Sequence, residues 1–310
     1  MGLLINGKWH DKWYDTAKSG GRFERQDSLF RNTIEKGGEF EAESGRYHLY
    51  VSLACPWAHR TLIMRQLKSL TSHISVSIVS PDMLDNGWTF LPYKGSTGDT
   101  LYGHRYMYEI YLRQQADVTT RVTVPVLWDK KTERIVNNES AEIIRILNNS
   151  FNDITGNYSD FYPEQLRPEI DEVNQWVYND INNGVYKAGF ATDQAVYEAA
   201  VDKLFSALDK VEARLQRQAF LVGNHLTEAD IRLFTTLVRF DAVYHGHFKC
   251  NRKQIQDYPA MFDYMKRIYR LDGVADTTNM DHIKRHYYYS HTMINPTQVV
   301  PVGPDVSLWK

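Results

Sequence analysis

A strand, helix and strand pattern over residues 46–80 is the feature that most constrains the fold. The run RYHLYVSLA (46–54) has the composition of a β-strand, and HISVSIVS (73–80) alternates apolar and polar residues as a half-buried strand does. Between them, the run CPWAHRTLIMRQLKSL has helical spacing of Leu62, Ile63, Leu67 and Leu70. Parallel strands joined in this way need a right-handed crossover. The pattern therefore predicts a β-α-β unit.

The following 70 residues predict the remainder of an α/β domain. Residues 80–100, SPDMLDNGWTFLPYKGSTGDT, are rich in Gly, Pro and Asp. Few connections of this length lack a function, so this stretch is a candidate binding loop. The run TVPVLWDKKTERIVNN (123–138) indicates two strands joined by a charged turn, and ESAEIIRILNNSF (139–151) indicates a helix. The expected order is β-α-β, loop, β-β-α, followed by a linker at FYPEQLR.

The second half of the chain is predicted to be an all-α bundle. The runs IDEVNQWVYNDINNGVY, AVYEAAVDKLFSALDKVEARLQ and ADIRLFTTLVRFDAVY carry apolar residues three and four apart, and Gly and Pro fall mainly between them. The first 45 residues are polar and rich in Gly, with aromatic residues that could pack against the domains. The expected division is an N-terminal arm (1–45), an α/β domain (46–152), an all-α domain (165–284) and an irregular tail (285–310).

Charge and composition exclude several functions. The 36 Lys and Arg residues nearly balance the 38 Asp and Glu residues. Without a basic stripe, nucleic-acid binding is not expected, because that affinity depends on neutralising phosphates. The longest uncharged stretch, Tyr287 to Pro304, is interrupted by polar residues, Gly and Pro, so no membrane span is predicted. The N-terminus shows no signal peptide. With two cysteines, a disulfide scaffold is excluded and a cytoplasmic location is expected.

Cys55 is the candidate nucleophile. It ends a strand and precedes a helix whose first residue is Pro56, where the missing N–H costs nothing. A thiol at this position lies beside free helix N–H groups and the positive end of the helix dipole, which lower a thiol pKa from about 8.5 to roughly 3.5–7.5. The alternative is a small buried apolar side chain. Ala58 occupies the place of a second thiol in a CxxC motif, and Cys250 is expected to be structural, so catalysis would need an external thiol.

A family resemblance extends over nearly the whole chain. The runs YHLYVSLACPWAHRTLIMR, NGWTF, RVTVPVLWD, NNESAEIIR, NNGVYKAGF, LTEADIRL and INPT resemble, in this order, the Xi-class glutathione transferases, which are S-glutathionyl-hydroquinone reductases. The resemblance implies an α/β thioredoxin-like N-terminal domain followed by an all-α C-terminal helical bundle. It also implies glutathione as a co-substrate, no tightly bound cofactor, and a mixed disulfide between Cys55 and glutathione that a second glutathione resolves.

The resemblance also implies a glutathione site. Pro125 matches the cis-proline of thioredoxin-like folds, which exposes the backbone of Val124 for pairing with the glutathione cysteinyl group. Glu139 would hold the γ-glutamyl ammonium and Ser140 its carboxylate, although plain helix capping is the alternative for this pair. Trp88, from the long loop, would cover the tripeptide. The full expected set is Trp88, Arg121, Val122, Thr123, Val124, Pro125, Glu139 and Ser140.

Three tyrosines match family positions around the second substrate. The resemblance implies that Tyr186 exchanges a proton with the departing hydroquinone, and that Tyr244 and Tyr287 donate hydrogen bonds to the Cys55 sulfur. A tyrosine on a helix is usually part of the core, so only the resemblance distinguishes these three from the other seventeen. In HYYYSH, Tyr288 or Tyr289 could be confused with Tyr287.

Two other sequence patterns say little about function. The pairs His245/His247 and His282/His286 are compatible with a metal, but no third ligand accompanies either, so no metal site is expected. LTEADI is a capping box in which Thr227 is the N-cap and Asp230 replaces the usual Glu or Gln, with Leu226 and Ile231 as a hydrophobic staple.

Reduction of glutathionyl-hydroquinones by a homodimeric enzyme is the leading prediction, and the homodimer rests on the resemblance alone. An Omega-like thioltransferase or dehydroascorbate reductase is the first alternative, because it would also use one cysteine. A non-catalytic transferase-like scaffold is the second, and the intact Cys-Pro-Trp-Ala argues against it.

Overall fold

The computed structural model describes residues 2–309 and divides the chain into two compact units. Unit 1 consists of Met1–Trp13, Gln26–Ser159 and Asp276–Thr292, and unit 2 of Tyr14–Arg25, Asp160–Ala275 and Met293–Lys310. Each unit is therefore assembled from segments that are distant in the sequence.

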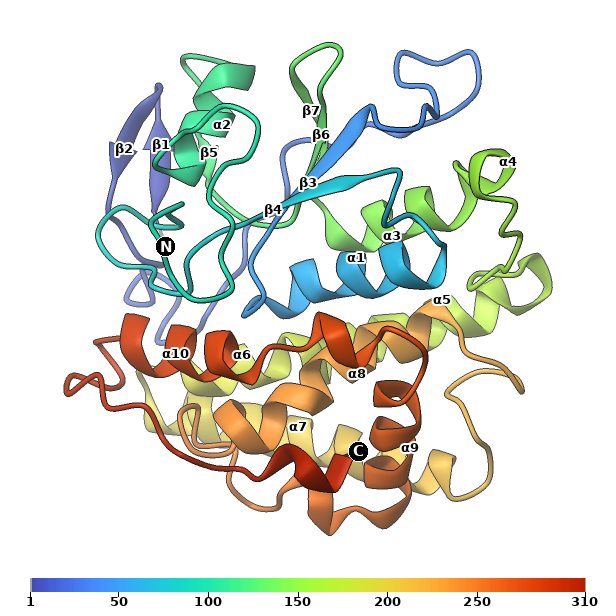
Figure 1. Cartoon of the computed structure of the whole chain (residues 1–310). Coiled ribbons are helices and arrows are strands. Elements are labelled where there is room, and N and C mark those ends of the chain that lie inside the picture. The colour runs from blue at the N-terminus through green and yellow to red at the C-terminus, as the bar shows by residue number, and fades with distance from the viewer. Residues whose placement is uncertain (1, 310) are drawn as a thin grey trace. The chain divides into compact units, whose positions relative to one another are not determined.

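A four-stranded mixed sheet with the order β4-β3-β6-β7 forms the centre of unit 1 (Figure 1). β3 pairs in parallel with β4 and antiparallel with β6, and β6 pairs antiparallel with β7. All five residues of β3 are buried, as a central strand requires. Helices α1 and α3 pack together on one face of the sheet. These elements are β3 (Tyr47–Val51), α1 (Pro56–Leu67), β4 (Ser75–Ile78), β6 (Val126–Asp129), β7 (Arg134–Asn137) and α3 (Ser140–Asn149).

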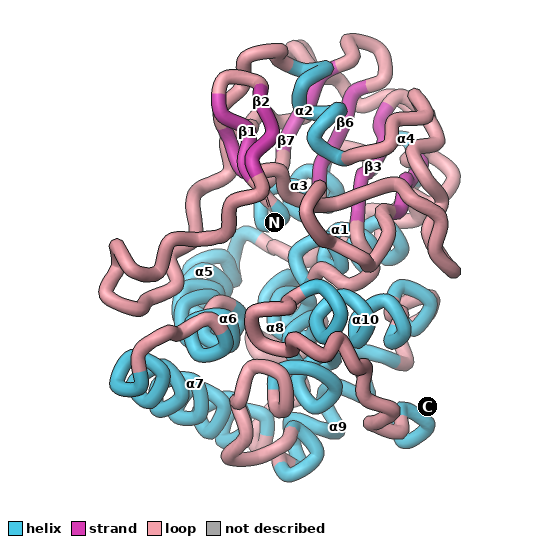
Figure 2. The backbone as a smooth tube through the Cα atoms, turned by 90° about the vertical axis from the view of Figure 1, so that its left-hand side faces the viewer, coloured by secondary structure: helices cyan, strands magenta, loops and turns pink. Residues whose placement is uncertain are grey.

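The first residues of the chain form a β-hairpin, where the sequence predicted an irregular arm. β1 (Leu3–Ile5) pairs with β2 (Lys8–His10) and with β5 (Thr120–Arg121), so the arm extends a second, three-stranded sheet (Figure 2). The turn is Asn6-Gly7 with φ of 48° and 73°, the left-handed pair of a type I′ turn. A side chain on Gly7 would collide with the Ala116 carbonyl. Two further helices complete this region, α2 (Met107–Gln114) and α4 (Asn152–Thr155).

Helix α10 (Met280–Ser290) belongs to unit 1, although it lies near the end of the chain. The Asn279 side chain caps it by accepting a hydrogen bond from the N–H of His282. The expected boundary at 284/285 falls inside this helix, so HYYYSH is largely helical and not part of an irregular tail. Its buried residues do recur three or four positions apart, but most of them are histidine, tyrosine or serine, so no apolar stripe marks the helix in the sequence.

The regular elements described in unit 2 are all helices, as predicted. Its longest helix is α7, which the Asp193 side chain caps. Two π-helical segments, Val177–Asn182 and Phe240–Tyr244, interrupt the long helical runs and were not predicted. The α-helices are α5 (Arg167–Trp176), α6 (Gly184–Gly189), α7 (Gln194–Leu215), α8 (Glu228–Arg239) and α9 (Pro259–Tyr269). The 3₁₀ turns are Glu164–Leu166, Ile255–Asp257 and Val306–Trp309, and a further one, Ala275–Thr277, lies at the boundary of the units.

The predicted fold class is confirmed: an α/β sheet domain followed by an all-α bundle. Among the described residues, no helix has the length and apolar character needed to cross a membrane.

Candidate active site

Cys55 caps the N-terminus of α1. Its backbone is extended, with φ of −74° and ψ of 122°, and Pro56 begins the helix, as the sequence predicted. The Cys55 carbonyl accepts the first helical hydrogen bond, from the N–H of His59 at 3.0 Å. Cys55 is buried, with 8% of the residue's surface exposed. The thiol therefore lies at the positive end of the α1 dipole, where a thiolate is stabilised.

The Cys55 sulfur lies next to a cis peptide bond. The bond joins Val124 to Pro125, and the Cys55 thiol donates to the Val124 carbonyl at 3.5 Å. The cis geometry agrees with the expectation from the resemblance. Strand β6 begins directly after Pro125, so the central sheet fixes this segment opposite the start of α1.

The residues before Val124 are held from two sides. Burial raises the pKa of the Tyr111 phenol, which keeps its proton and donates to the Thr123 carbonyl at 2.9 Å. The N–H of Val122 donates to the Gly2 carbonyl at 3.5 Å. The Arg121 guanidinium donates to the carbonyl of Lys12 at 2.8 Å and to that of Trp13 at 3.3 Å. Arg121 therefore anchors the end of the N-terminal segment in unit 1, a role that the sequence did not predict.

Glu139 and Ser140 lie at the N-terminus of α3. The Glu139 carboxylate accepts hydrogen bonds from the N–H of Ala141 at 3.0 Å and from the Ser28 hydroxyl at 3.1 Å. Arg60 of α1 donates to the Ser140 hydroxyl at 3.5 Å. The capping interpretation is thus correct for Glu139. The carboxylate is held in place at a helix N-terminus, which leaves a binding role compatible with capping.

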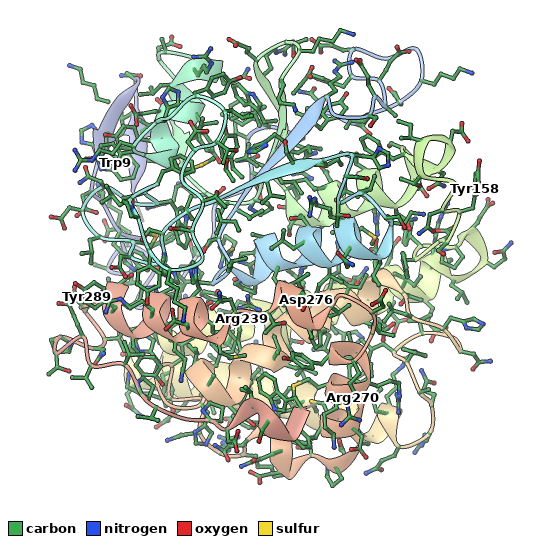
Figure 3. The ribbon with its side chains drawn as sticks, viewed as in Figure 1. Trp9, Tyr158, Arg239, Arg270, Asp276 and Tyr289 are labelled. Atoms are coloured by element: carbon green, nitrogen blue, oxygen red, sulfur yellow. The ribbon has the colours of Figure 1, made fainter. Side chains whose placement is uncertain are left out.

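Trp88 lies in the long loop after β4 and is buried. Its indole stacks on the His286 ring, with centroids 4.6 Å apart and planes inclined by 22°. The loop is attached to the first residues of the chain through Trp9, whose indole N–H donates to the Asp85 carbonyl at 2.9 Å. Figure 3 labels Trp9 and, on α10, Tyr289.

Tyr287 is almost fully buried on α10. Its ring meets the edge of His286 at 5.2 Å and that of His291 at 5.4 Å. The His291 ring also contacts Trp13 at 5.7 Å. Tyr287 belongs to unit 1, as Cys55 and Trp88 do.

Tyr186 and Tyr244 lie in unit 2 and contact each other, with ring centroids 6.1 Å apart. Both pack against Phe248, and Tyr186 also packs against Phe23 of the N-terminal segment 14–25. The Arg25 guanidinium lies over the Tyr186 ring at 5.0 Å. Two of the three tyrosines thus belong to one aromatic cluster.

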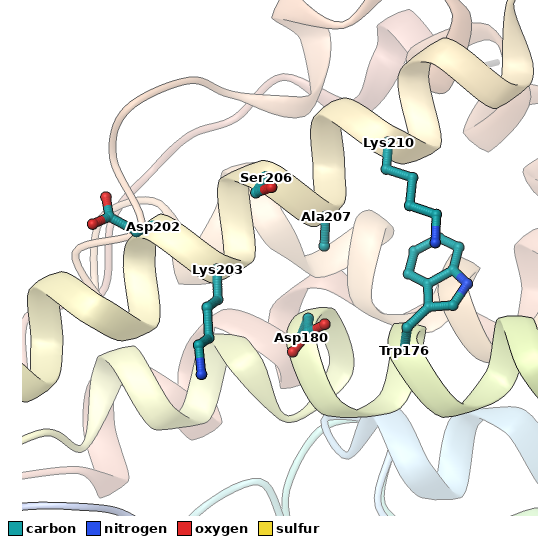
Figure 4. Close-up of a pocket in the computed structure, with 7 residues that line it drawn as sticks. All are labelled: Trp176, Asp180, Asp202, Lys203, Ser206, Ala207 and Lys210. Atoms are coloured by element: carbon teal, nitrogen blue, oxygen red, sulfur yellow. The ribbon is translucent and has the colours of Figure 1, made fainter.

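A surface pocket of about 680 Å³ lies elsewhere in unit 2 (Figure 4). Its lining mixes charges, with Asp180 opposite Lys203, and the Lys210 ammonium lies 4.2 Å from the centre of the Trp176 ring. None of the predicted site residues lines this pocket.

Cys250 lies in an environment that differs from that of Cys55. Burial raises the pKa of the Cys250 thiol, so this thiol stays protonated. Its sulfur donates to the Phe248 carbonyl at 3.8 Å. Within residues 2–309, no three His, Cys, Asp or Glu side chains are grouped so that they could hold a metal ion.

Comparison with known proteins assigns the family. The family model described as "Glutathione S-transferase, N-terminal domain" matches residues 54–150, and the C-terminal domain model matches residues 194–267. Glutathionyl-hydroquinone reductase YqjG of Escherichia coli is 54% identical over 98% of this chain and 95% of its own length. The glutathione transferase Xi of Phanerochaete chrysosporium has a crystal structure that superposes with a TM-score of 0.91, at 52% identity over 93% of this chain and 94% of that one. The chain belongs to the Xi-class glutathione transferases.

Two further matches agree with this assignment. Glutathionyl-hydroquinone reductase PcpF of Sphingobium chlorophenolicum is 54% identical to this Xi-class transferase over 98% of the chain and 96% of its own length. The glutathione-bound structure of YqjG superposes with a TM-score of 0.90, covering 98% of this chain and 96% of that one at 51% identity.

Sequence reasoning missed several residues of this Xi-class transferase that contact predicted site residues within the same unit. His286 and His291 contact Tyr287, Ser28 binds Glu139, and Arg25 covers Tyr186. Only His286 had a visible signal, its i,i+4 spacing from His282, which was considered for metal binding. The others reach the site through contacts between distant segments, which no local pattern reveals.

Proposed function

We propose that this protein reduces S-glutathionyl-hydroquinones with glutathione, releasing the hydroquinone and oxidised glutathione. The observation that carries the proposal is the Cys55 thiol, which lies at the N-terminus of α1 and 3.5 Å from the carbonyl that precedes cis-Pro125. The names of the two relatives, both glutathionyl-hydroquinone reductases, support the same activity.

In the first step, the Cys55 thiolate attacks the sulfur of the glutathionyl group. A bond forms between the two sulfurs and the bond from sulfur to the hydroquinone carbon breaks, so its electron pair goes to the ring carbon, which takes a proton. Tyr186 is the proposed proton donor, because a phenol can serve where water is excluded. Tyr244 and Tyr287 are proposed to donate hydrogen bonds to the sulfur, which would stabilise the thiolate.

In the second step, the thiolate of another glutathione attacks the glutathione sulfur of the mixed disulfide. Oxidised glutathione leaves and the Cys55 thiolate is regenerated. The hydroquinone carbon is reduced by two electrons, and two glutathionyl groups supply them by joining in a disulfide. Ala58 leaves no second thiol at the helix start, which is consistent with resolution by an external glutathione.

The proposed glutathione contacts follow the path of a tripeptide across unit 1. The Val124 backbone would pair with the cysteinyl group, and Glu139 and Ser140 would take the ammonium and carboxylate of the γ-glutamyl group at the N-terminus of α3. Trp88 would cover the peptide. Arg121, Val122 and Thr123, which are held by Gly2, Tyr111 and the Lys12–Trp13 backbone, would form one edge of the site.

Two substitutions test the nucleophile. Cys55→Ser should abolish reduction of a glutathionyl-hydroquinone while retaining glutathione binding, and Cys250→Ser is the matched control that should leave turnover unchanged. Mass spectrometry after incubation with oxidised glutathione should show one glutathione adduct, on Cys55. Persistent turnover by Cys55→Ser would refute the assignment, and the absence of an adduct would favour a scaffold.

The Omega-like alternative is tested by substrate choice. The wild-type protein is given a glutathionyl-hydroquinone and a small mixed disulfide of glutathione in parallel. Faster turnover of the glutathionyl-hydroquinone is expected, and faster turnover of the mixed disulfide would favour a thioltransferase.

We also propose a homodimer in the cytoplasm, with glutathione and aromatic glutathionyl-hydroquinones as partners, and no nucleic-acid or membrane partner. Light scattering that gives the mass of a single chain would contradict the dimer.

A further inference from the structure

We propose that His286 is the positioning residue for Trp88, and that its ring holds the indole in the orientation that glutathione binding requires. This inference rests on the proposed function, because it assumes that Trp88 covers glutathione. It assigns a role to a histidine that the proposed chemistry does not use directly.

The contact between the two rings is close and nearly parallel. The centroids are 4.6 Å apart with an interplanar angle of 22°, and both side chains are buried. Trp88 comes from a loop of more than 20 residues between β4 and α2, so the sheet does not fix its side chain directly. His286 lies within α10, a regular helix. The Trp88 carbonyl accepts a hydrogen bond from the N–H of Met107 at 2.9 Å, which holds the backbone, so what His286 sets is the orientation of the indole.

The orientation of the imidazole is itself determined. Its Nδ1 atom lies 3.0 Å from the Pro81 carbonyl, which can only accept, so Nδ1 carries the proton and donates. The edges of the ring meet Tyr287 at 5.2 Å and His291 at 5.4 Å. The hydrogen bond sets the rotation of the ring, and the ring then presents one face to Trp88.

Other contacts keep α10 in register with the loop. Arg285 forms a bidentate ion pair with Asp82 at 2.7 and 3.0 Å, and the N–H of Met83 donates to the Ser290 hydroxyl at 2.9 Å. The His282 ring lies 2.6 Å from the Lys94 carbonyl. These contacts attach the loop to α10 on both sides of Trp88. His286 is the residue among them that touches the indole.

The same ring also contacts a proposed catalytic residue. His286 and Tyr287 are neighbours on α10, and their rings meet edge to face at 73°. One imidazole therefore contacts both the proposed cover of glutathione and one of the tyrosines assigned to the sulfur. Loss of the ring should weaken glutathione binding through Trp88 first, because the stacked face is on that side.

The test measures binding directly, without turnover. All variants are made in the Cys55→Ser background, and calorimetry with S-methylglutathione, which cannot form a mixed disulfide, gives the dissociation constant. His286→Ala should weaken binding about three- to tenfold, the range of an aromatic contact. His286→Phe keeps the ring and should bind within twofold of the parent. In this variant the Pro81 carbonyl loses the imidazole donor but still accepts a hydrogen bond from the Ser290 hydroxyl, at 3.3 Å.

His286→Asn keeps a hydrogen-bond donor without the ring, and should weaken binding as His286→Ala does. This comparison with His286→Phe decides the question even where His286→Ala fails to fold. Lys284→Ala, at a partly exposed position of the same helix, is the matched control and should leave binding unchanged. If Asn restores binding and Phe does not, the inference is overturned.

A double-mutant cycle adds a second readout. If His286 acts through the indole, Trp88→Ala and the double variant Trp88→Ala/His286→Ala should bind equally weakly. Additive losses would mean that His286 acts by another route and would overturn the inference. If the Cys55→Ser parent itself does not bind S-methylglutathione, the proposed function fails. If the parent binds and the His286 variants all bind equally well, only the inference fails.

Discussion

His48 makes the central sheet of this protein sensitive to acid. It lies in β3 and is completely buried, and its Nδ1 atom is 2.7 Å from the Ser75 hydroxyl. The Nε2 atom has no hydrogen-bond partner among the described residues. Burial is the main cause that lowers the pKa of His48 from 6.5 to about 4. The positive charges of Lys130 and Arg65 contribute to this lowering of the pKa, and the negative charge of Asp99 opposes it. A protonated ring would place an unpartnered charge in the sheet.

The direction of the pH effect follows from these two pKa values. Between pH 6.5 and 4 the unfolded chain binds a proton at His48 and the folded chain does not, so acid favours unfolding. The stability that the neutral ring provides is fully present above pH 6.5 and is lost progressively as the pH falls from 6.5 to about 4. The values differ by about 2.5, and each unit is worth about 1.4 kcal/mol, so the loss is about 3 kcal/mol.

The comparison is between wild type and His48→Asn, which can bond to Ser75 but does not titrate. Denaturant unfolding at pH 4 to 8, with hydrogen exchange of peptides from residues 46–51 to identify unit 1, gives the free energy of unfolding. The variant should be less stable than the wild type above pH 6.5, and on acidification to pH 4 the wild type should lose about 3 kcal/mol more than the variant, so that the two curves converge. Parallel curves for the two proteins would refute the reasoning, because the other titrating groups are the same in both.

Three further changes have expected outcomes. Asp230→Ala removes the acceptor of four buried hydrogen bonds at the start of α8. It should destabilise unit 2 by about 3–5 kcal/mol and lower the melting temperature of the unit by roughly 6–20 °C, and a change under about 2 °C would contradict this. Asp129→Ala leaves the guanidinium of Arg46 buried without its bidentate partner and should cost about 3–5 kcal/mol in denaturant unfolding, whereas a loss below about 1 kcal/mol would mean that the pair adds nothing net. Arg121→Ala should speed cleavage by trypsin after residue 12 about tenfold, since two hydrogen bonds to residues 12–13 are lost; an unchanged digestion rate would show that the backbone there is held by other contacts.

The regular elements were predictable because their signals are local. Strand β3, helix α1 and strand β4 each lie within the runs that predicted them, and so do β6, β7 and α3. The capping box of Thr227 and Asp230 is present as predicted. In all of these the deciding interactions join residues a few positions apart, so that periodicity and capping chemistry suffice.

The hairpin at the start of the chain was missed although its signal was present. Asn-Gly between two short apolar and aromatic runs is the strongest short-range sign of a two-residue turn. The polar character of the surrounding 45 residues favoured an irregular arm instead. What stabilises the hairpin is its pairing with β5, more than 100 residues away, which the sequence does not reveal.

The candidate site was predictable only in part. Local chemistry identifies Cys55, because a cysteine before Pro at a strand-to-helix junction has a physical reason to react. The positions of Trp88, Tyr186 and Tyr287 depend on tertiary packing, and their roles were assigned from family resemblance. His286 could not be assigned at all, since its importance comes from a ring stacked on it from a loop 198 positions earlier.

The chain passes from one compact unit to the other at residues 13/14, 25/26, 159/160, 275/276 and 292/293. A gene cut at the obvious linker would therefore produce two incomplete products. The first fragment would lack α10 and its contacts with the loop that carries Trp88, and the second would lack residues 14–25, including Phe23 and Arg25. Experiments that exchange halves between related enzymes should instead transfer each of these short segments together with the unit to which it belongs.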